Sequence, residues 1–173
     1  QLSQARTALK GDDQWEQSFA TCLYRPFDVR PIYYSDVVIE FARYDVMQHM
    51  LKDNLALLTV RRIRSDTYTH FGVSQTLVGK DAVSMLDSCV VLPLYLYPNG
   101  NPAMLLDGTE TVPWDPDPER GRRVPNLAPK FVAEMEEKLG LPFDPFCHSE
   151  RSEESKAFGP RDVLAYIYAV FHS

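Results

Sequence analysis

Three arginines lie beside a predicted turn, and the side chains that follow them are of the kinds that read DNA. Arginine binds guanine through two hydrogen bonds and glutamine binds adenine similarly, while hydroxyl groups more often contact phosphates. The alternative is a solvated hairpin whose arginines only keep a strand edge soluble. The residue types alone do not separate these interpretations. The first assigns DNA contact to Arg61, Arg62, Arg64, Thr67, Tyr68 and Gln75.

A second group of charges surrounds a predicted turn near the start of the chain. Arg25 and Arg30 flank Asp28, so both arginines could face a DNA backbone, or one could bridge the aspartate inside the turn. We predict structural roles for Asp28 and Arg25. Arg30 stays open between the two roles and is kept as a candidate DNA contact. Tyr33 and Tyr34 could stack on an extruded base, but packing in the core is the commoner role of such residues.

Gly79-Lys80 matches two positions of a phosphate-binding loop pattern, but the other required residues are missing. The pattern requires a glycine five residues before Gly79 and Ser or Thr after Lys80. Ser74 and Asp81 occupy these positions. We therefore expect no ATP binding here and keep Lys80 as a candidate phosphate contact.

Catalytic and metal-binding patterns are weak throughout the chain. Asp117 with Glu136-Glu137-Lys138 satisfies the loose pattern of a metal-dependent nuclease, but a solvated helix face explains the latter three better. The four histidines have no Cys or acidic partners at ligand spacing. The three cysteines are far apart, which favours reduced thiols, and Cys22 and Cys89 are predicted to be buried. No catalytic residue, metal ligand or cofactor is predicted for this chain.

Three runs of residues carry a resemblance to a known family. They are 23–34 (LYRPFDVRPIYY), 92–98 (LPLYLYP) and 158–173 (FGPRDVLAYIYAVFHS). In this order they resemble the C-terminal specificity region of type ISP restriction-modification enzymes, and the resemblance covers roughly residues 19–173. It favours DNA contact by the arginine-rich hairpin over a merely solvated tip.

The resemblance implies a bacterial, cytoplasmic polypeptide that joins a nuclease, an ATP-driven translocase, an adenine-N6 methyltransferase and this region. S-adenosylmethionine, ATP and Mg²⁺ would then bind to the other domains. This region would recognise a short site in double-stranded DNA and position it for the methyltransferase. The alternative is a structural module that couples methyltransferase to motor. A nuclease is a weaker third hypothesis.

Length and composition fit one globular domain. The chain has 173 residues, 45% hydrophobic and 24% charged. No apolar run approaches the ~18 residues that span a bilayer, and nothing resembles a signal peptide. Because it opens on Gln1 and stops within an apolar helical pattern, we expect a piece of a longer polypeptide. We expect residues 1–18 to be the tail of a preceding linker or helix, and residues 19–173 to be the recognition domain.

The net charge of −6 opposes DNA binding, but the charge is unevenly distributed. Residues 20–80 contain eight basic and six acidic side chains, a net charge of +2. The remainder contains ten basic and eighteen acidic ones, a net charge of −8. A cationic face is therefore possible in the N-terminal half.

The patterns predict an α+β domain with a mixed, mainly antiparallel sheet and two C-terminal scaffold helices. Strands are expected at 19–25 and 29–34, joined by a turn, with Pro31 placing the second at an edge. Further strands are expected at 55–60, 68–78 and 89–97, and a helix at 42–52. Asn126 is expected to cap a helix that ends at Gly140, and another helix starts at 159–160. Residues 99–125 and 147–157 are expected to be a long loop and a variable inserted loop.

Overall fold

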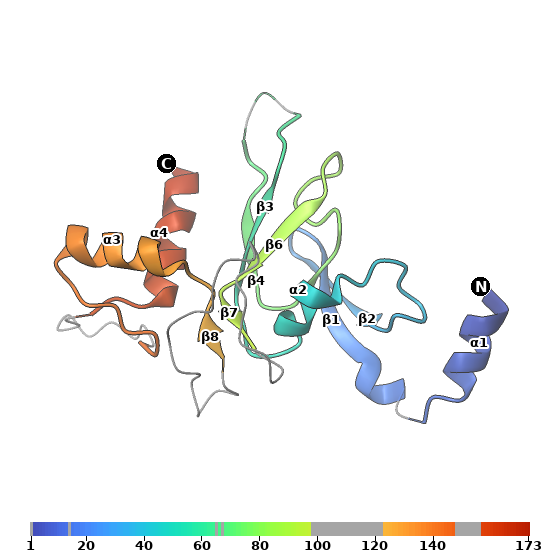
Figure 1. Cartoon of the computed structure of the whole chain (residues 1–173). Helices are drawn as coiled ribbons and strands as arrows, with labels where there is room; N and C mark the ends of the chain where they lie inside the picture. The colour runs from blue at the N-terminus through green and yellow to red at the C-terminus, as the bar shows by residue number, and fades with distance from the viewer. Residues whose placement is uncertain (1, 14, 65, 67, 98–122, 148–156) are drawn as a thin grey trace. The chain divides into compact units, whose positions relative to one another are not determined.

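The computed structural model describes residues 2–13, 15–64, 66, 68–97, 123–147 and 157–173 (Figure 1). The chain divides into two compact units, residues 1–92 and residues 93–173. The predicted loops 99–125 and 147–157 fall outside the described residues, apart from 123–125, 147 and 157. The predicted boundary after residue 18 stays a prediction.

The first unit begins with α1 (Leu2–Lys10) and the 3-10 turn η1 (Trp15–Ser18), which lead into a β-hairpin. The strands β1 (Phe19–Arg25) and β2 (Asp28–Tyr33) pair antiparallel, which confirms the predicted strand–turn–strand. β5 (Leu77–Val78) pairs with β1 in parallel, giving the order β2-β1-β5. β2 is thus an edge strand, as Pro31 predicted, because proline has no N–H to donate to a further strand.

A second small sheet of this unit has the order β4-β3-β6. Its central strand β3 (Ala56–Val60) is almost entirely buried, as predicted. The strand predicted over 68–78 is wrong as one element, because β4 (Gly72–Ser74) pairs with β3 whereas β5 joins the other sheet. The break between them is a turn in which the Ser74 hydroxyl accepts a hydrogen bond from the Thr76 N–H.

Helix α2 (Tyr44–Met50) packs Met47 and Met50 into the core of the first unit. Arg43 immediately precedes it with φ 47°, and its guanidinium donates to the Val78 and Cys89 carbonyls at 3.2 and 3.1 Å. This arginine therefore ties α2 to β5 and β6 (Cys89–Pro93), one strand from each sheet. Cys22 and Cys89 are buried, as predicted, and burial raises the pKa of the Cys89 thiol to about 11.

The second unit contains β7 (Tyr95–Leu96), which pairs antiparallel with β8 (Val124–Pro125), and helix α3 (Pro129–Leu139). The strand predicted over 89–97 is interrupted at Leu94, where β6 ends and β7 begins. Asn126 does not cap α3, because its side-chain amide donates to the Pro93 carbonyl and its N–H to the Leu94 carbonyl. Gly140 ends the helix with φ 63°, as predicted.

The last helix, α4 (Pro160–His172), starts where predicted and follows Gly159. Asp162 in its first turn accepts a hydrogen bond from the Gly159 N–H at 3.0 Å. Val163 and Leu164 are buried, but the rest of its predicted apolar stripe is only half-buried or exposed.

No helix among the described residues is long and apolar enough to cross a membrane. The predicted α+β class is confirmed, with the strands distributed over three small sheets.

Candidate nucleic-acid interface

Three segments lie at one end of the first unit, and we call them the loop end (Figure 1). They are residues 25–30, which contain the β1–β2 turn, residues 61–71, which follow β3, and residues 79–88, which precede β6. Ser65 and Thr67 fall outside the described residues. The loop end carries most of the charged residues that the sequence analysis selected.

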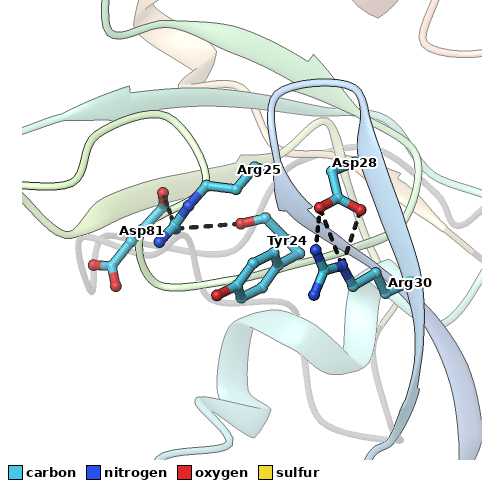
Figure 2. Close-up of polar contacts among 5 residues, drawn as sticks. All are labelled: Tyr24, Arg25, Asp28, Arg30 and Asp81. Carbon is cyan, nitrogen blue, oxygen red and sulfur yellow. Dashed lines mark hydrogen bonds and ion pairs between the residues drawn. The ribbon is translucent and has the colours of Figure 1, made fainter.

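Two hydrogen bonds hold segment 79–88 against β1, one between backbone groups and one from the side chain of Arg25. The Gly79 N–H donates to the Leu23 carbonyl at 2.9 Å, and a Cβ on residue 79 would approach that oxygen to 3.3 Å. Glycine therefore suits this close approach, because a side chain would crowd the backbone of β1. The Arg25 guanidinium donates to the Asp81 carbonyl at 2.7 Å (Figure 2), so Arg25 has the structural role that was predicted for it.

Asp28 and Arg30 form an ion pair beside the turn, with Nη2 and Oδ2 2.6 Å apart (Figure 2). The Arg30 hydrogen bond lowers the pKa of the Asp28 carboxyl below its usual value. The Tyr24 ring contacts two guanidinium groups, those of Arg25 at 4.7 Å and Arg30 at 4.2 Å from the ring centroid. Arg30 thus fills the bridging role considered for this turn, while its side chain stays 58% exposed.

The turn itself consists of Pro26 and Phe27, because Arg25 pairs with Asp28 across the hairpin. Phe27 has φ 63°, a left-handed conformation that costs a residue other than glycine about 1–2 kcal/mol. Its ring is fully exposed. The turn was predicted from the sequence but Phe27 was not singled out in it, although an aromatic residue in a proline turn is itself a signal.

Arg61 and Arg62 are exposed, and neither forms an ion pair with another described residue. Arg64 differs, because its Nε lies 3.1 Å from Oδ1 of Asp87 in segment 79–88. The Arg64 side chain nevertheless remains 59% exposed, whereas that of Asp87 is 9% exposed. The ion pair therefore orients an accessible guanidinium rather than burying it.

The loop end is positively charged within an acidic chain. It contains six basic and four acidic side chains, a net charge of +2, whereas the whole chain has −6. The basic residues are Arg25, Arg30, Arg61, Arg62, Arg64 and Lys80. A cationic surface with exposed guanidinium groups is what contact with nucleic acid requires.

A model of the type ISP C-terminal specificity domain matches residues 1–173. The chain belongs to this family. No curated protein and no solved structure matches it. Membership confirms the resemblance seen in the sequence and implies DNA target recognition in a restriction enzyme. Specificity domains of this kind are typically non-catalytic.

The specificity domain brings only part of the predicted contact set together. Arg30, Arg61, Arg62, Arg64 and Lys80 belong to the loop end, whereas Thr67 falls outside the described residues.

Gln75 is exposed but lies elsewhere, because its neighbour Ser74 pairs with Ala56 at the opposite end of β3 from Arg61. At ~3.3 Å per residue, Gln75 is roughly 16 Å from the arginines along the strand.

Tyr68 stabilises the segment that contains it. Its hydroxyl is hydrogen-bonded to that of Thr59, and its ring stacks on Phe71 with centroids 5.7 Å apart. Tyr33 and Tyr34 also use their hydroxyls internally, donating to Asp12 and to the Ala42 carbonyl. These tyrosines therefore stabilise the unit, and the DNA contacts predicted for Tyr68 and the other selected residues stay predictions.

The nuclease pattern gains no support from its described members. Glu136 accepts a hydrogen bond from the Phe143 N–H at 2.8 Å, which is a structural role at the end of α3. Asp117 falls outside the described residues. Within the described part of the chain, no group of three or more His, Cys, Asp or Glu side chains could hold a metal ion.

Proposed function

We propose that the loop end holds and reads a short duplex DNA site, so that an adenine-N6 methyltransferase in the same polypeptide can act on it. The observation that carries this proposal is the exposure of Arg61 and Arg62 directly after the buried strand β3. The buried strand fixes the backbone from which the exposed guanidinium groups can reach base edges. S-adenosylmethionine, ATP and Mg²⁺ would bind to other domains, and this chain would catalyse no reaction itself.

Arg64 is suited to reading a base because its partner leaves the outer edge of the guanidinium available. Asp87 engages Nε, so the two terminal nitrogens can donate to the O6 and N7 acceptors of a guanine. Orientation by the aspartate reduces the freedom that would be lost on binding. Arg30 and Lys80 would contact phosphates, which position the duplex without specifying its sequence.

Selection from a pool of random duplexes tests this proposal. The wild-type protein should enrich one short sequence, and Arg61→Ala with Arg62→Ala should relax the preference at one or two positions. Loss of such a contact costs about 1–3 kcal/mol of discrimination at each base pair. Lys138→Ala, which removes an exposed cation from α3, is the matched control and should leave the selected sequence unchanged. An unaltered sequence from the double arginine variant would overturn the proposal.

One observation favours the alternative, a module that couples the methyltransferase to the motor. Trp15, Phe19 and Tyr33 make successive edge-to-face contacts, with centroids 5.9 and 5.5 Å apart, at the end of the β1–β2 hairpin opposite its turn. Trp15 and Phe19 are both about half exposed. Such aromatic side chains are typical of contacts between proteins.

Exchange of segment 61–71 for that of a relative distinguishes the two functions in the full-length protein. A DNA reader changes the methylated sequence, whereas a coupling module changes only the efficiency of methylation. Restricting the exchange to this segment leaves the buried strand β3 intact.

A further inference from the structure

Phe27 is placed where neither its side chain nor its backbone favours folding. Its relative exposure is 103%, so the ring makes no contribution to the core. Pro26 followed by a residue with φ 63° is the pattern of a type II turn, whose third position normally holds glycine or asparagine. A phenylalanine at this position therefore indicates a role outside the folded chain.

Contacts on both sides of the turn restrict its motion. The guanidinium of Arg25 is anchored on the Asp81 carbonyl, and that of Arg30 is anchored on the Asp28 carboxylate. The pairing of β1 with β2 continues to Arg25 and Asp28, immediately beside the turn. The Phe27 ring is thus presented from a fixed support, which reduces the entropy lost when it binds.

The charges around Phe27 indicate which partner it fits. Arginines flank the turn on both strands, and the whole loop end has a net charge of +2. Proteins that bend DNA insert single phenylalanines between base pairs, while nearby cations neutralise the phosphates.

Building on the proposed DNA recognition, we propose that Phe27 inserts between two base pairs of the bound duplex and unstacks them. The wedge opens one step of the duplex, and Arg25 and Arg30 lie beside the phosphates that flank it. Insertion also fixes the register of the duplex against the arginines of segment 61–71. Phe27 is accordingly a positioning residue for the recognised site.

Three variants of the full-length protein test this role. Phe27→Asn removes the ring and suits the left-handed backbone, whereas Phe27→Leu keeps an apolar wedge. Phe41→Asn is the matched control, because Phe41 is 79% exposed in the same unit but lies outside the loop end. The probe is the duplex that the wild-type protein selects from a random pool, with 2-aminopurine placed at each position in turn.

Wild type and Phe27→Leu should raise 2-aminopurine fluorescence at one step, and Phe27→Asn should not. The affinity of Phe27→Asn should fall roughly tenfold, as expected when one stacked base is lost. Its melting temperature should equal or exceed that of wild type, because the strained residue is gone. Phe41→Asn should match wild type in binding and in fluorescence.

Other outcomes overturn the inference in distinguishable ways. If wild type binds the duplex and no position becomes fluorescent, or if Phe27→Asn gives the wild-type signal, the wedge is wrong while DNA recognition stands. Weaker binding by Phe27→Asn without unstacking in wild type would assign the ring to another contact. If the wild-type protein selects no duplex, the proposed function and the wedge are both wrong.

Discussion

Tyr34 connects the end of the β1–β2 hairpin to the segment that leads into α2. Its hydroxyl donates to the Ala42 carbonyl, one residue before Arg43, whose guanidinium joins β5 to β6. Its ring stacks on that of Tyr44 with centroids 6.3 Å apart. Burial raises the pKa of the Tyr34 hydroxyl to about 12. A single side chain thus links the β1–β2 hairpin to the residues around the start of α2.

We expect Tyr34→Phe to lower the free energy of unfolding by about 0.5–1.5 kcal/mol at pH 7, because one intramolecular hydrogen bond is lost. The pH dependence should also change. Unfolding returns the tyrosine pKa from about 12 to its usual value of 10.0, so the wild-type protein loses stability as the pH rises from 10 to 12. Tyr34→Phe should lose less over that interval. Urea titrations at several pH values measure both effects.

Tyr44→Phe is the control for this prediction. Its hydroxyl makes no hydrogen bond within the described part of the chain, and the ring that stacks on Tyr34 is retained. It should therefore leave stability at pH 7 nearly unchanged. Equal effects of the two substitutions would contradict the role assigned to the Tyr34 hydroxyl.

At the scale of elements, local patterns predicted most strands and helices correctly. Alternating residues around a proline turn predicted β1 and β2, an unbroken apolar run predicted β3, and proline and glycine marked the ends of α3 and α4. The division of residues 68–78 between two sheets was not predictable in this way. It depends on the pairing of β5 with β1, more than fifty residues away along the chain.

The same distinction applies to the candidate site. That Arg61, Arg62 and Arg64 come directly after a buried strand was predictable from the sequence, because it depends on neighbouring residues. The ion pair between Arg64 and Asp87 was not predictable in this way, because only the tertiary structure brings the two residues together. Gln75 was grouped with the arginines along the sequence, yet the antiparallel pairing of β4 places it at the far end of β3.

Helix α4 depends on a close approach at its first residues, and this gives a prediction for the second unit. A Cβ on residue 159 would lie 2.7 Å from the Cys147 Cβ and 3.1 Å from the Asp144 carbonyl oxygen. Gly159→Ala must therefore displace the start of α4, at a cost of about 1–3 kcal/mol. Amide hydrogen exchange of Val163 and Leu164 should become faster.

Two internal comparisons accompany this measurement. Amides of β1, in the other unit, should exchange at the wild-type rate. Gly11→Ala introduces a Cβ with ordinary contacts of 3.7 Å and should protect α4 as wild type does. If the amide exchange rates of α4 in Gly159→Ala equal those of wild type, the packing around residue 159 accommodates a Cβ without cost, and the prediction is wrong.

At the scale of the whole molecule, the charge distribution reconciles DNA binding with an acidic chain. The loop end has a net charge of +2 and the chain has −6, so the remaining residues carry −8. Negative charge elsewhere repels the duplex, which favours approach through the loop end. Binding through a few cations also predicts a measurable dependence on salt, because each neutralised phosphate releases counterions.

Lys80 provides the test of this charge model. Because it is exposed in segment 79–88, we expect it to neutralise one phosphate. Lys80→Ala should weaken binding to all duplexes similarly, and the slope of log K against log salt should become shallower by about 1. Lys138→Ala removes the same charge from α3 and should alter the slope little. Because both variants have the same net charge, a difference between their slopes shows that the position of the charge matters. Identical slopes for the two variants would mean that binding depends only on total charge. The loop end would then not be the surface that contacts DNA.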